Sequence, residues 1–128
     1  MILDASALVA IFLGEPDAER LLQAIGDAPI IAVGAPTLVE AAIVLSSRLG
    51  RDARPQLGEF LREAEVEIVP FTADHYEVAL DAFRRFGQGR HPAALNFGDC
   101  FAYACARHER VPLLYKGDDF SQTDIETA

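Results

Sequence analysis

The chain has 128 residues, 51% of them apolar, and its 20 acidic residues outnumber 11 basic ones for a formal net charge of −9. This length and apolar content suit one domain with its own hydrophobic core. No apolar run approaches the roughly 20 residues that a membrane span requires, and Asp4 interrupts the N-terminal run, which lacks a basic flank. We therefore expect a single domain over residues 1–128 that acts in the cytoplasm without a membrane.

In the first half of the chain, short strands alternate with helices. A buried strand is expected at residues 1–3, followed by a helix at 7–13 that Ser6 can cap. A second helix is expected at 16–25, with Pro16 at its first position. The remaining elements of this half are a β-branched strand and two helices that start near prolines, at residues 30–33, 36–49 and 55–64.

The second half continues the alternation, with a strand at 67–69 and a helix at 72–86. Four residues of this helix have the spacing of a core-facing stripe: Tyr76, Ala79, Leu80 and Phe83. Residues 87–95 contain two glycines and a proline and are expected to form an exposed loop.

The last helix, at 96–108, is apolar almost all round, so we expect it at the centre of the domain or at a subunit contact. A final strand at 112–115 precedes a tail with at most one turn and a short edge strand. Strands that alternate with helices imply an α/β fold with a parallel sheet covered on both faces.

Cysteines and histidines give no sign of a zinc site. Cys100 and Cys105 lie on different faces of one predicted helix, which excludes a disulfide between them and indicates core residues. The three histidines lie far apart in the sequence and form no closely spaced ligand pair.

Acidic residues stand where parallel strands end and helices begin. Asp4 follows the first strand, Asp99 lies in the first turn of the last helix, and Asp118 and Asp119 follow the last strand. The carboxyl ends of parallel strands share one edge of the sheet, so we expect these side chains to gather there with Glu40. Clustered carboxylates repel one another unless a cation neutralises them. The pattern indicates a hard divalent metal ion and chemistry on phosphate.

Glu40 is informative because it lies inside the apolar run LVEAAIVL, where a lone carboxylate is costly to bury. A structural ion pair is the alternative to a metal-binding role. Thr37 lies on the same predicted helix face and is a candidate for supporting Glu40 through a hydrogen bond.

Three choices stay open at this point. Asp4 can simply terminate a strand, and Ser6 can act only as a helix cap or can also orient Asp4. The spacing does not choose between Asp118 and Asp119.

The net charge of −9 argues at first against a nucleic-acid partner, since such proteins usually carry a basic surface. Without the five candidate acids, however, 15 acids face 11 bases, a balance of −4. Two divalent cations would supply four positive charges where a phosphodiester must approach.

Four segments in register resemble the PIN-domain toxins of the VapC type, the ribonuclease half of a type II toxin–antitoxin pair. They are MILDASAL at the N-terminus, PTLVEAA around Glu40, LNFGDCFAYACA around Asp99 and LLYKGDDFSQTDI near the C-terminus. The similarity runs from the first residue to the end of the chain.

The resemblance implies a three-layer α/β/α fold and RNA cleavage with Mg²⁺ or Mn²⁺ held by Asp4, Glu40 and Asp99. It places the fourth acid at Asp119, in the DF of KGDDF, with Asp118 as the alternate. It also implies a homodimer and a VapB-like antitoxin whose C-terminal segment lies across the active-site groove.

Further expectations follow from charge. The antitoxin tail should carry a basic side chain to engage the acids, and promoter DNA should be bound only through the antitoxin, since a surface at −9 suits duplex DNA poorly. Arg90, on the loop that leads to Asp99, is a candidate contact for substrate phosphate, with a solvated loop cation as the alternative.

Two other classes compete with the ribonuclease. A PIN-like domain that binds RNA or a protein without cutting is one, although all the acids are intact here. A phosphoaspartate phosphatase is the other, but a haloacid-dehalogenase-like enzyme wants a second aspartate where this chain has Ser6.

Overall fold

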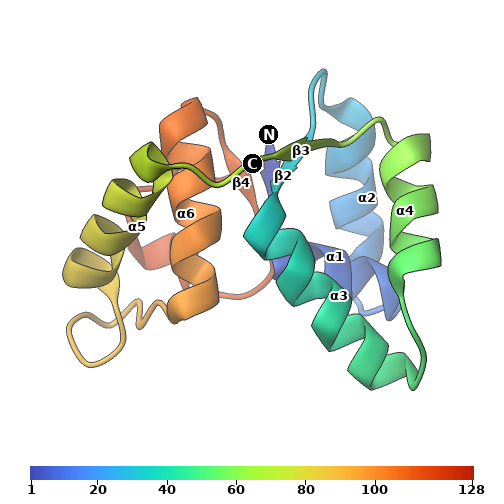
Figure 1. Cartoon of the computed structure of the whole chain (residues 1–128), viewed down its shortest axis with the longest axis horizontal. Helices are drawn as coiled ribbons and strands as arrows, with labels where there is room; N and C mark the ends of the chain where they lie inside the picture. Colours follow the sequence, from blue (N-terminus) through green and yellow to red (C-terminus); the bar gives the residue numbers. More distant parts are fainter.

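A parallel four-stranded sheet lies at the centre of the computed structural model, which describes all residues from 1 to 128 (Figure 1). Its strands are β1 (Ile2–Leu3), β2 (Ala32–Gly34), β3 (Glu67–Val69) and β4 (Leu113–Leu114). Their spatial order is β3-β2-β1-β4, with Ile2 paired to Ala32 on one side and to Leu113 on the other. The predicted parallel sheet is confirmed, and each strand lies within two residues of its predicted position.

The helices form the two outer layers. They are α1 (Ala5–Phe12), α2 (Ala18–Asp27), α3 (Ala35–Leu49), α4 (Arg54–Glu63), α5 (Ala73–Phe86) and α6 (Phe97–Glu109). In Figure 1, α5 and α6 cover one face of the sheet, whereas α1, α2 and α4 lie on the other. Helix α3 contacts both α1 and α6. The α/β/α architecture that the sequence predicted is therefore confirmed.

The strands divide the core into two parts because successive side chains point to opposite faces of a sheet. Ile2, Ala32 and Leu113 pack with α5 and α6, whereas Leu3 and Val33 belong to the core beneath α1 and α2. Both faces of β1, β2 and β4 are covered, which explains why these strands are continuously apolar, whereas Glu67 and Ile68 of the edge strand β3 are exposed. Both cysteines are free and buried in the first of these cores, as predicted.

Two helix starts differ from the prediction. Asp4, not Ser6, is the N-cap of α1, because its carboxylate accepts a hydrogen bond from the backbone N–H of Ser6 at 3.0 Å. The helix therefore begins at Ala5. Helix α2 begins at Ala18 rather than Pro16, so the proline lies in the preceding turn.

The predicted core-facing stripe of α5 is wrong for two of its four members. Ala79 is buried and Phe83 packs partly buried against the core, but Tyr76 is 55% exposed and Leu80 is 46% exposed. The residues that face the core instead are His75, Ala79, Ala82 and Phe86. The apolar stripe lines an open groove of about 490 Å³ shared with Phe97 and Phe101 at the start of α6.

The C-terminal tail follows the expectation of one turn and a short edge pairing. A 3₁₀ helix spans Phe120–Gln122, and Thr127 forms an isolated parallel bridge with Leu113. Asp124 anchors this tail to the domain, since it accepts hydrogen bonds from the Tyr103 hydroxyl at 2.6 Å and from Arg85 at 2.9 Å. No helix combines the length and apolar character needed to cross a membrane.

Candidate active site

Asp4 is a buried carboxylate at the carboxyl end of β1. Only 3% of the residue is exposed, and its backbone N–H donates to the Leu114 carbonyl oxygen of β4 at 2.9 Å. Oδ2 accepts from the Ser6 backbone at 3.0 Å and from the Ser6 hydroxyl at 2.5 Å, whereas Oδ1 is buried without a hydrogen-bond partner. Burial raises the pKa of Asp4 even though the Ser6 hydrogen bonds favour the charged form. The orphaned oxygen is suited to a cation.

Asp99 is held in place by a reciprocal capping box at the start of α6. Its Oδ2 accepts from the Asn96 backbone N–H at 3.0 Å, and its own N–H donates to Asn96 Oδ1 at 2.9 Å. Burial raises the pKa of Asp99 to about 6, and the charges of Asp4, Asp119 and Glu40 add to the shift. The four carboxylates therefore lie near enough for their charges to act on one another.

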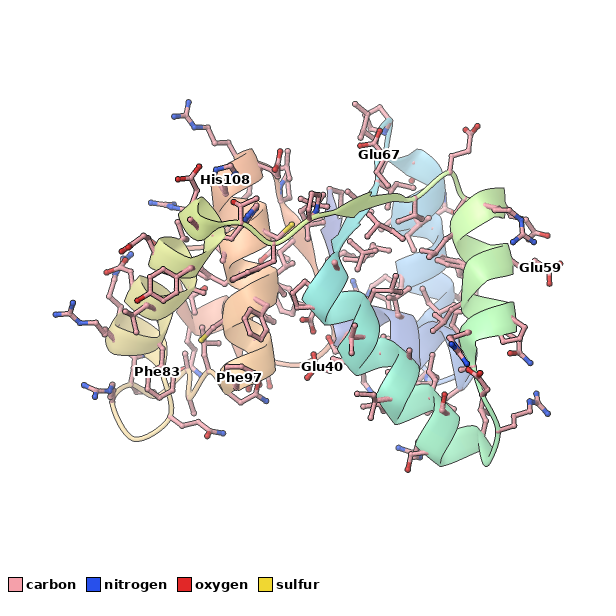
Figure 2. All side chains as sticks on the ribbon, in the orientation of Figure 1. Glu40, Glu59, Glu67, Phe83, Phe97 and His108 are labelled. Atoms are coloured by element: carbon pink, nitrogen blue, oxygen red, sulfur yellow. The ribbon has the colours of Figure 1, made fainter.

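Glu40 reaches the same region from α3. In Figure 2 its side chain extends from α3 toward the first turn of α6, where Phe97 is labelled. Burial and then the charge of Asp4 raise the pKa of Glu40. Gly98 of α6 lies so close that a Cβ atom there would overlap the Glu40 carboxylate. A side chain larger than that of glycine at this position would therefore displace the Glu40 carboxylate.

The tail contributes Asp119 rather than Asp118 to this cluster. The charge of Asp119 raises the pKa of both Asp4 and Asp99, whereas that of Asp118 is not among the causes. Both residues are exposed, and Asp118 uses its carbonyl oxygen to accept from the Ser121 hydroxyl at 2.6 Å. The influence of its charge on Asp4 and Asp99 therefore favours the choice of Asp119.

The three remaining candidates, Ser6, Thr37 and Arg90, differ in how they relate to the acids. Ser6 contacts Asp4 directly, as one of its two predicted roles requires. Thr37 is buried on the inner face of α3 with a hydroxyl that has no hydrogen-bond partner, so it does not support Glu40 as expected. Arg90 is exposed, with its guanidinium carbon 5.8 Å from the centroid of the Phe83 ring, and forms no ion pair with the acids.

Two hydrogen-bonded contacts of the site were not predicted from the sequence. In the first, the Lys116 backbone N–H donates to the Ser6 hydroxyl at 3.0 Å, while the Lys116 ammonium group pairs with Glu15 outside the site. The second is the Asn96–Asp99 capping box. It could have been predicted, because Asn96 is a residue type common at helix N-caps and stands three positions before an acid.

The histidines also differ from expectation. His75 and His108, which lie far apart in the sequence, have ring centroids 4.5 Å apart, and Glu109 is next to them. This cluster lies between the start of α5 and the end of α6, and it is not part of the acidic site.

The acidic site fits a divalent cation on the basis of its donors. All four side chains offer carboxylate oxygens, one of them a buried orphan, and no lysine or arginine forms an ion pair with them. Burial and neighbouring charges raise the pKa values of Asp4, Glu40 and Asp99, so their charged forms are disfavoured without a counter-ion. Oxygen-only donor sets with surplus negative charge are typical of Mg²⁺ and Mn²⁺ sites.

Replacing Ser6 with alanine should weaken this site. The variant removes the hydroxyl that fixes Asp4 Oδ2 and that receives the Lys116 N–H. Because hydrogen bonds to ligating groups typically contribute 10- to 100-fold, we expect roughly a 10-fold loss of Mg²⁺ affinity. Calorimetric titration of each metal-free protein with Mg²⁺ measures this affinity. Ser6→Thr, which keeps a hydroxyl, is the matched control. Equal affinity in all three proteins would contradict the role of Ser6.

Gly98→Ala should displace the Glu40 carboxylate without unfolding the domain, since the overlapping atoms are at the tip of a flexible side chain. We expect Mg²⁺ affinity to fall by roughly 10-fold while the melting temperature changes little. Gly26→Ala in α2, where an added Cβ meets nothing within 4 Å, is the control. An unchanged Mg²⁺ affinity would show that Glu40 does not depend on this contact.

A parallel α/β/α sandwich with four acids at one edge of its sheet defines a PIN domain, and the PIN-domain family profile matches residues 1–126. Ribonuclease VapC of Mycolicibacterium smegmatis is 46% identical over 125 residues, covering 98% of this chain and 97% of that protein. Ribonuclease VapC30 of Mycobacterium tuberculosis is 42% identical over 127 residues, covering 99% and 97%. The chain belongs to the VapC group of PIN-domain proteins.

Solved structures agree in fold. VapC20 of Mycobacterium tuberculosis, described as a toxin that cleaves the sarcin-ricin loop, has a TM-score of 0.79 at 18% identity and covers 99% of this chain and 97% of its own. VapBC2 of Rickettsia felis, bound to promoter DNA, has a TM-score of 0.73 at 18% identity and covers 98% and 94%.

Proposed function

We propose that this protein is a metal-dependent endoribonuclease toxin that acts in the cytoplasm and is inhibited by a VapB-like antitoxin. The observation that carries the proposal is the cluster of Asp4, Glu40, Asp99 and Asp119, in which burial and mutual charge raise the pKa values of the first three. Relatives named Ribonuclease VapC, at 42–46% identity over nearly the whole chain, support the same class of activity.

The four carboxylates would hold Mg²⁺ or Mn²⁺, which would activate water and stabilise negative charge on the scissile phosphate. The chain's own residues fix the geometry. Ser6 and the Asn96 backbone hold Asp4 and Asp99 in single orientations. Asp119, which is exposed, would accept a proton from water as the phosphodiester is attacked.

Cleavage of a structured RNA with and without Mg²⁺ tests this function. The reaction should proceed with Mg²⁺ or Mn²⁺, stop with EDTA and resume when the ion is restored in excess. RNA binding without any cleavage by the metal-saturated protein would instead support the non-cutting PIN-like domain. Hydrolysis of a small phosphate monoester without RNA cleavage would support the phosphatase.

Arg90 is proposed to contact substrate phosphate. It is exposed on the loop before α6, held near Phe83 and free of ion pairs. Arg90→Ala should weaken RNA binding a few-fold and lower the slope of binding against salt concentration by about one phosphate contact. Arg62→Ala, on α4, is the control. A salt slope equal to that of the unaltered protein would remove Arg90 from the binding surface.

A second copy of the chain is the proposed partner of the apolar face formed by α3, α5 and α6. Large side chains on this face are strongly exposed, including Phe97 at 79%, Ile43 at 65% and Val39 at 58%. They line a groove of about 470 Å³ that also contains Glu40, so the face adjoins the acidic site. Exposed apolar patches of this kind are typical of protein interfaces. A homodimer would bury them and set two acidic sites side by side.

The antitoxin is proposed to use the opposite side of the molecule for its apolar segment. A groove of about 480 Å³ lies between α2 and α4, lined by Leu22, Ile25 and Phe60 among others. An amphipathic helix can bind such a groove while a basic tail extends to the acids. The structurally similar VapBC2 of Rickettsia felis is bound to promoter DNA, which supports an antitoxin partner for this chain and promoter binding by the two proteins together.

A further inference from the structure

The C-terminal tail that carries Asp119 is tied to two different elements of the domain. Beyond Asp124, the Leu113 backbone N–H donates to the Glu126 carbonyl oxygen at 2.9 Å, so the last residues are joined to β4. The hydrogen bonds and ion pairs between the tail and α6 instead all involve Asp124. Helix α6 also carries Asp99. Asp124 therefore joins the helix that bears one candidate acid to the segment that bears another.

Tyr103 is the hydrogen-bond partner of Asp124 on α6. It lies one helical turn after Asp99, on the same side of the helix, and only 1% of the residue is exposed. Its hydroxyl donates to Asp124 Oδ1 at 2.6 Å, a short distance that is typical of a hydrogen bond to a carboxylate. Asp124 Oδ2 accepts from Arg85 of α5 at 2.9 Å. Both helices of this layer therefore hold the carboxylate.

The neighbours of Asp124 keep it ionised. Burial acts to raise its pKa, but the hydrogen bonds from Tyr103 and Arg85 and the charges of Arg85 and Arg107 hold the pKa below its ordinary value. Burial and the hydrogen bond to Asp124 raise the pKa of Tyr103 to about 12. At neutral pH the hydroxyl is thus protonated and the carboxylate is charged, so the contact is a charge-assisted hydrogen bond.

The chain between Asp119 and Asp124 forms a short hydrogen-bonded unit. Asp119 is the N-cap of the 3₁₀ helix that begins at Phe120, and its side chain makes no hydrogen bond to that helix. The Thr123 backbone N–H and hydroxyl both donate to the Phe120 carbonyl oxygen, at 3.0 and 2.7 Å. The Phe120 side chain is buried, with its ring centroid 5.1 Å from that of Tyr115. A displacement of Asp124 would therefore turn the unit about Phe120 and move Asp119.

We propose that the hydrogen bond between Tyr103 and Asp124 positions Asp119 relative to Asp99 and so raises the affinity of the acidic site for a divalent cation. Tyr103 and Asp124 are positioning residues, because both act through the tail and neither is a ligand. Phe120 fixes where the unit begins, and the contact with α6 fixes how it is turned. The inference rests on the proposed function only in treating Asp119 as part of the metal site.

Calorimetric titration of the metal-free protein with Mg²⁺ tests the proposal through Tyr103→Phe, which keeps the ring and removes only the hydroxyl. Groups that contact a ligand directly contribute about 10- to 100-fold to metal affinity, so for this indirect contact we expect a loss of roughly 5-fold. Asp119→Asn should lose at least as much. In the Asp119→Asn background, Tyr103→Phe should cause no further loss, because the hydroxyl then has no ligand to position.

Two further variants complete the comparison. Asp124→Ala, at an exposed residue, should reproduce the loss seen with Tyr103→Phe. Tyr115→Phe is the matched control, since it removes a hydroxyl that lies 3.0 Å from Thr127 Oγ1 and ties only the end of the tail, beyond Asp124. Both tyrosine variants should melt at a somewhat lower temperature, but Tyr115→Phe should bind Mg²⁺ as tightly as the unaltered protein.

The affinities decide the matter without reference to catalysis. The proposal is overturned if Tyr103→Phe and Asp124→Ala bind Mg²⁺ as tightly as the unaltered protein, or if Tyr115→Phe loses as much affinity as Tyr103→Phe. It is equally overturned if Tyr103→Phe weakens binding to the same extent in the Asp119→Asn background, because the effect would then not pass through Asp119. The expected pattern of affinities in a protein that cleaves no RNA would support the positioning role and refute the ribonuclease.

Discussion

Asp99→Asn is expected to lower RNA cleavage by about 1,000-fold, because the amide keeps the shape of the side chain and loses the charge that a hard cation requires. The fold should be kept, since the amide oxygen of the new side chain can still accept from the Asn96 backbone N–H that Asp99 now engages. Single-turnover cleavage at saturating Mg²⁺ measures the effect. Undiminished cleavage by a folded, metal-saturated variant would remove Asp99 from the site.

The same variant should be more stable than the unaltered protein when no metal is present. The folded pKa of Asp99 is about 6 against 3.8 in a model carboxyl group, so the folded state binds this proton more tightly than the unfolded state. The resulting contribution is fully present below pH 3.8 and is lost as pH rises through 6, at most about 3 kcal/mol before solvent screening is considered. The variant's advantage in melting temperature should therefore be largest at pH 7, roughly 5 °C, and vanish near pH 4.

Asp17→Asn is the matched control for that comparison. Asp17 lies at the start of α2, outside the acidic site, and pairs only with Arg20 at 3.9 Å. Its replacement should leave stability near neutral pH almost unchanged. If metal-free Asp99→Asn were less stable at pH 7 than at pH 4, relative to the unaltered chain, repulsion within the site would be disproved.

The sequence predicted the position of the acids because simple rules govern where parallel strands end. Asp4 follows β1 and the Asp118–Asp119 pair follows β4, and these two strands pair directly, so the approach of the acids follows from the order of strands. The choice of Asp119 over Asp118 came instead from the family resemblance. Glu40 was found because an apolar helix rarely contains an unpaired carboxylate. These inferences need only local pattern and the geometry of a parallel sheet.

What the sequence did not predict depends on how two helices cross. Helical spacing identified an apolar stripe on α5 but not its direction, so Tyr76 and Leu80 were assigned to the core although they line a surface groove. The approach of His75 to His108 and of Gly98 to Glu40 likewise arises from the packing of α5, α6 and α3. No rule of spacing within one helix contains that information.

Ser6 and Thr37 show the same limit at the level of single side chains. Both carry hydroxyls near a candidate acid in the sequence, yet only Ser6 contacts one. Ser6 lies two residues from Asp4 at a helix start, where the N-cap geometry brings the two side chains together. Thr37 is a buried residue of α3. Whether such a residue faces the core or the site depends on how the neighbouring helix packs, which the sequence does not show.

Co-expression with the product of a neighbouring antitoxin gene should restore growth by several orders of magnitude in cells that produce this chain, and the two proteins should copurify. We expect the antitoxin tail to carry an Arg or Lys that enters the acidic site, because surplus carboxylates with raised pKa values favour a cation and the fixed fork of arginine can engage two of them.

The basic residue gives this prediction its sharpest test. Its replacement by alanine should speed dissociation of the complex and weaken inhibition by roughly 30-fold or more, since truncating one partner of a buried charge pair typically costs about 2–5 kcal/mol. Arg→Lys should retain part of the inhibition. When the alanine change in the antitoxin is combined with Asp99→Asn in the toxin, the loss of binding free energy should be smaller than the sum of the two separate losses if both residues share one contact. Additive effects would place the tail elsewhere, and a neighbour that neither copurifies nor suppresses cleavage would refute the toxin–antitoxin assignment while leaving the metal-dependent nuclease intact.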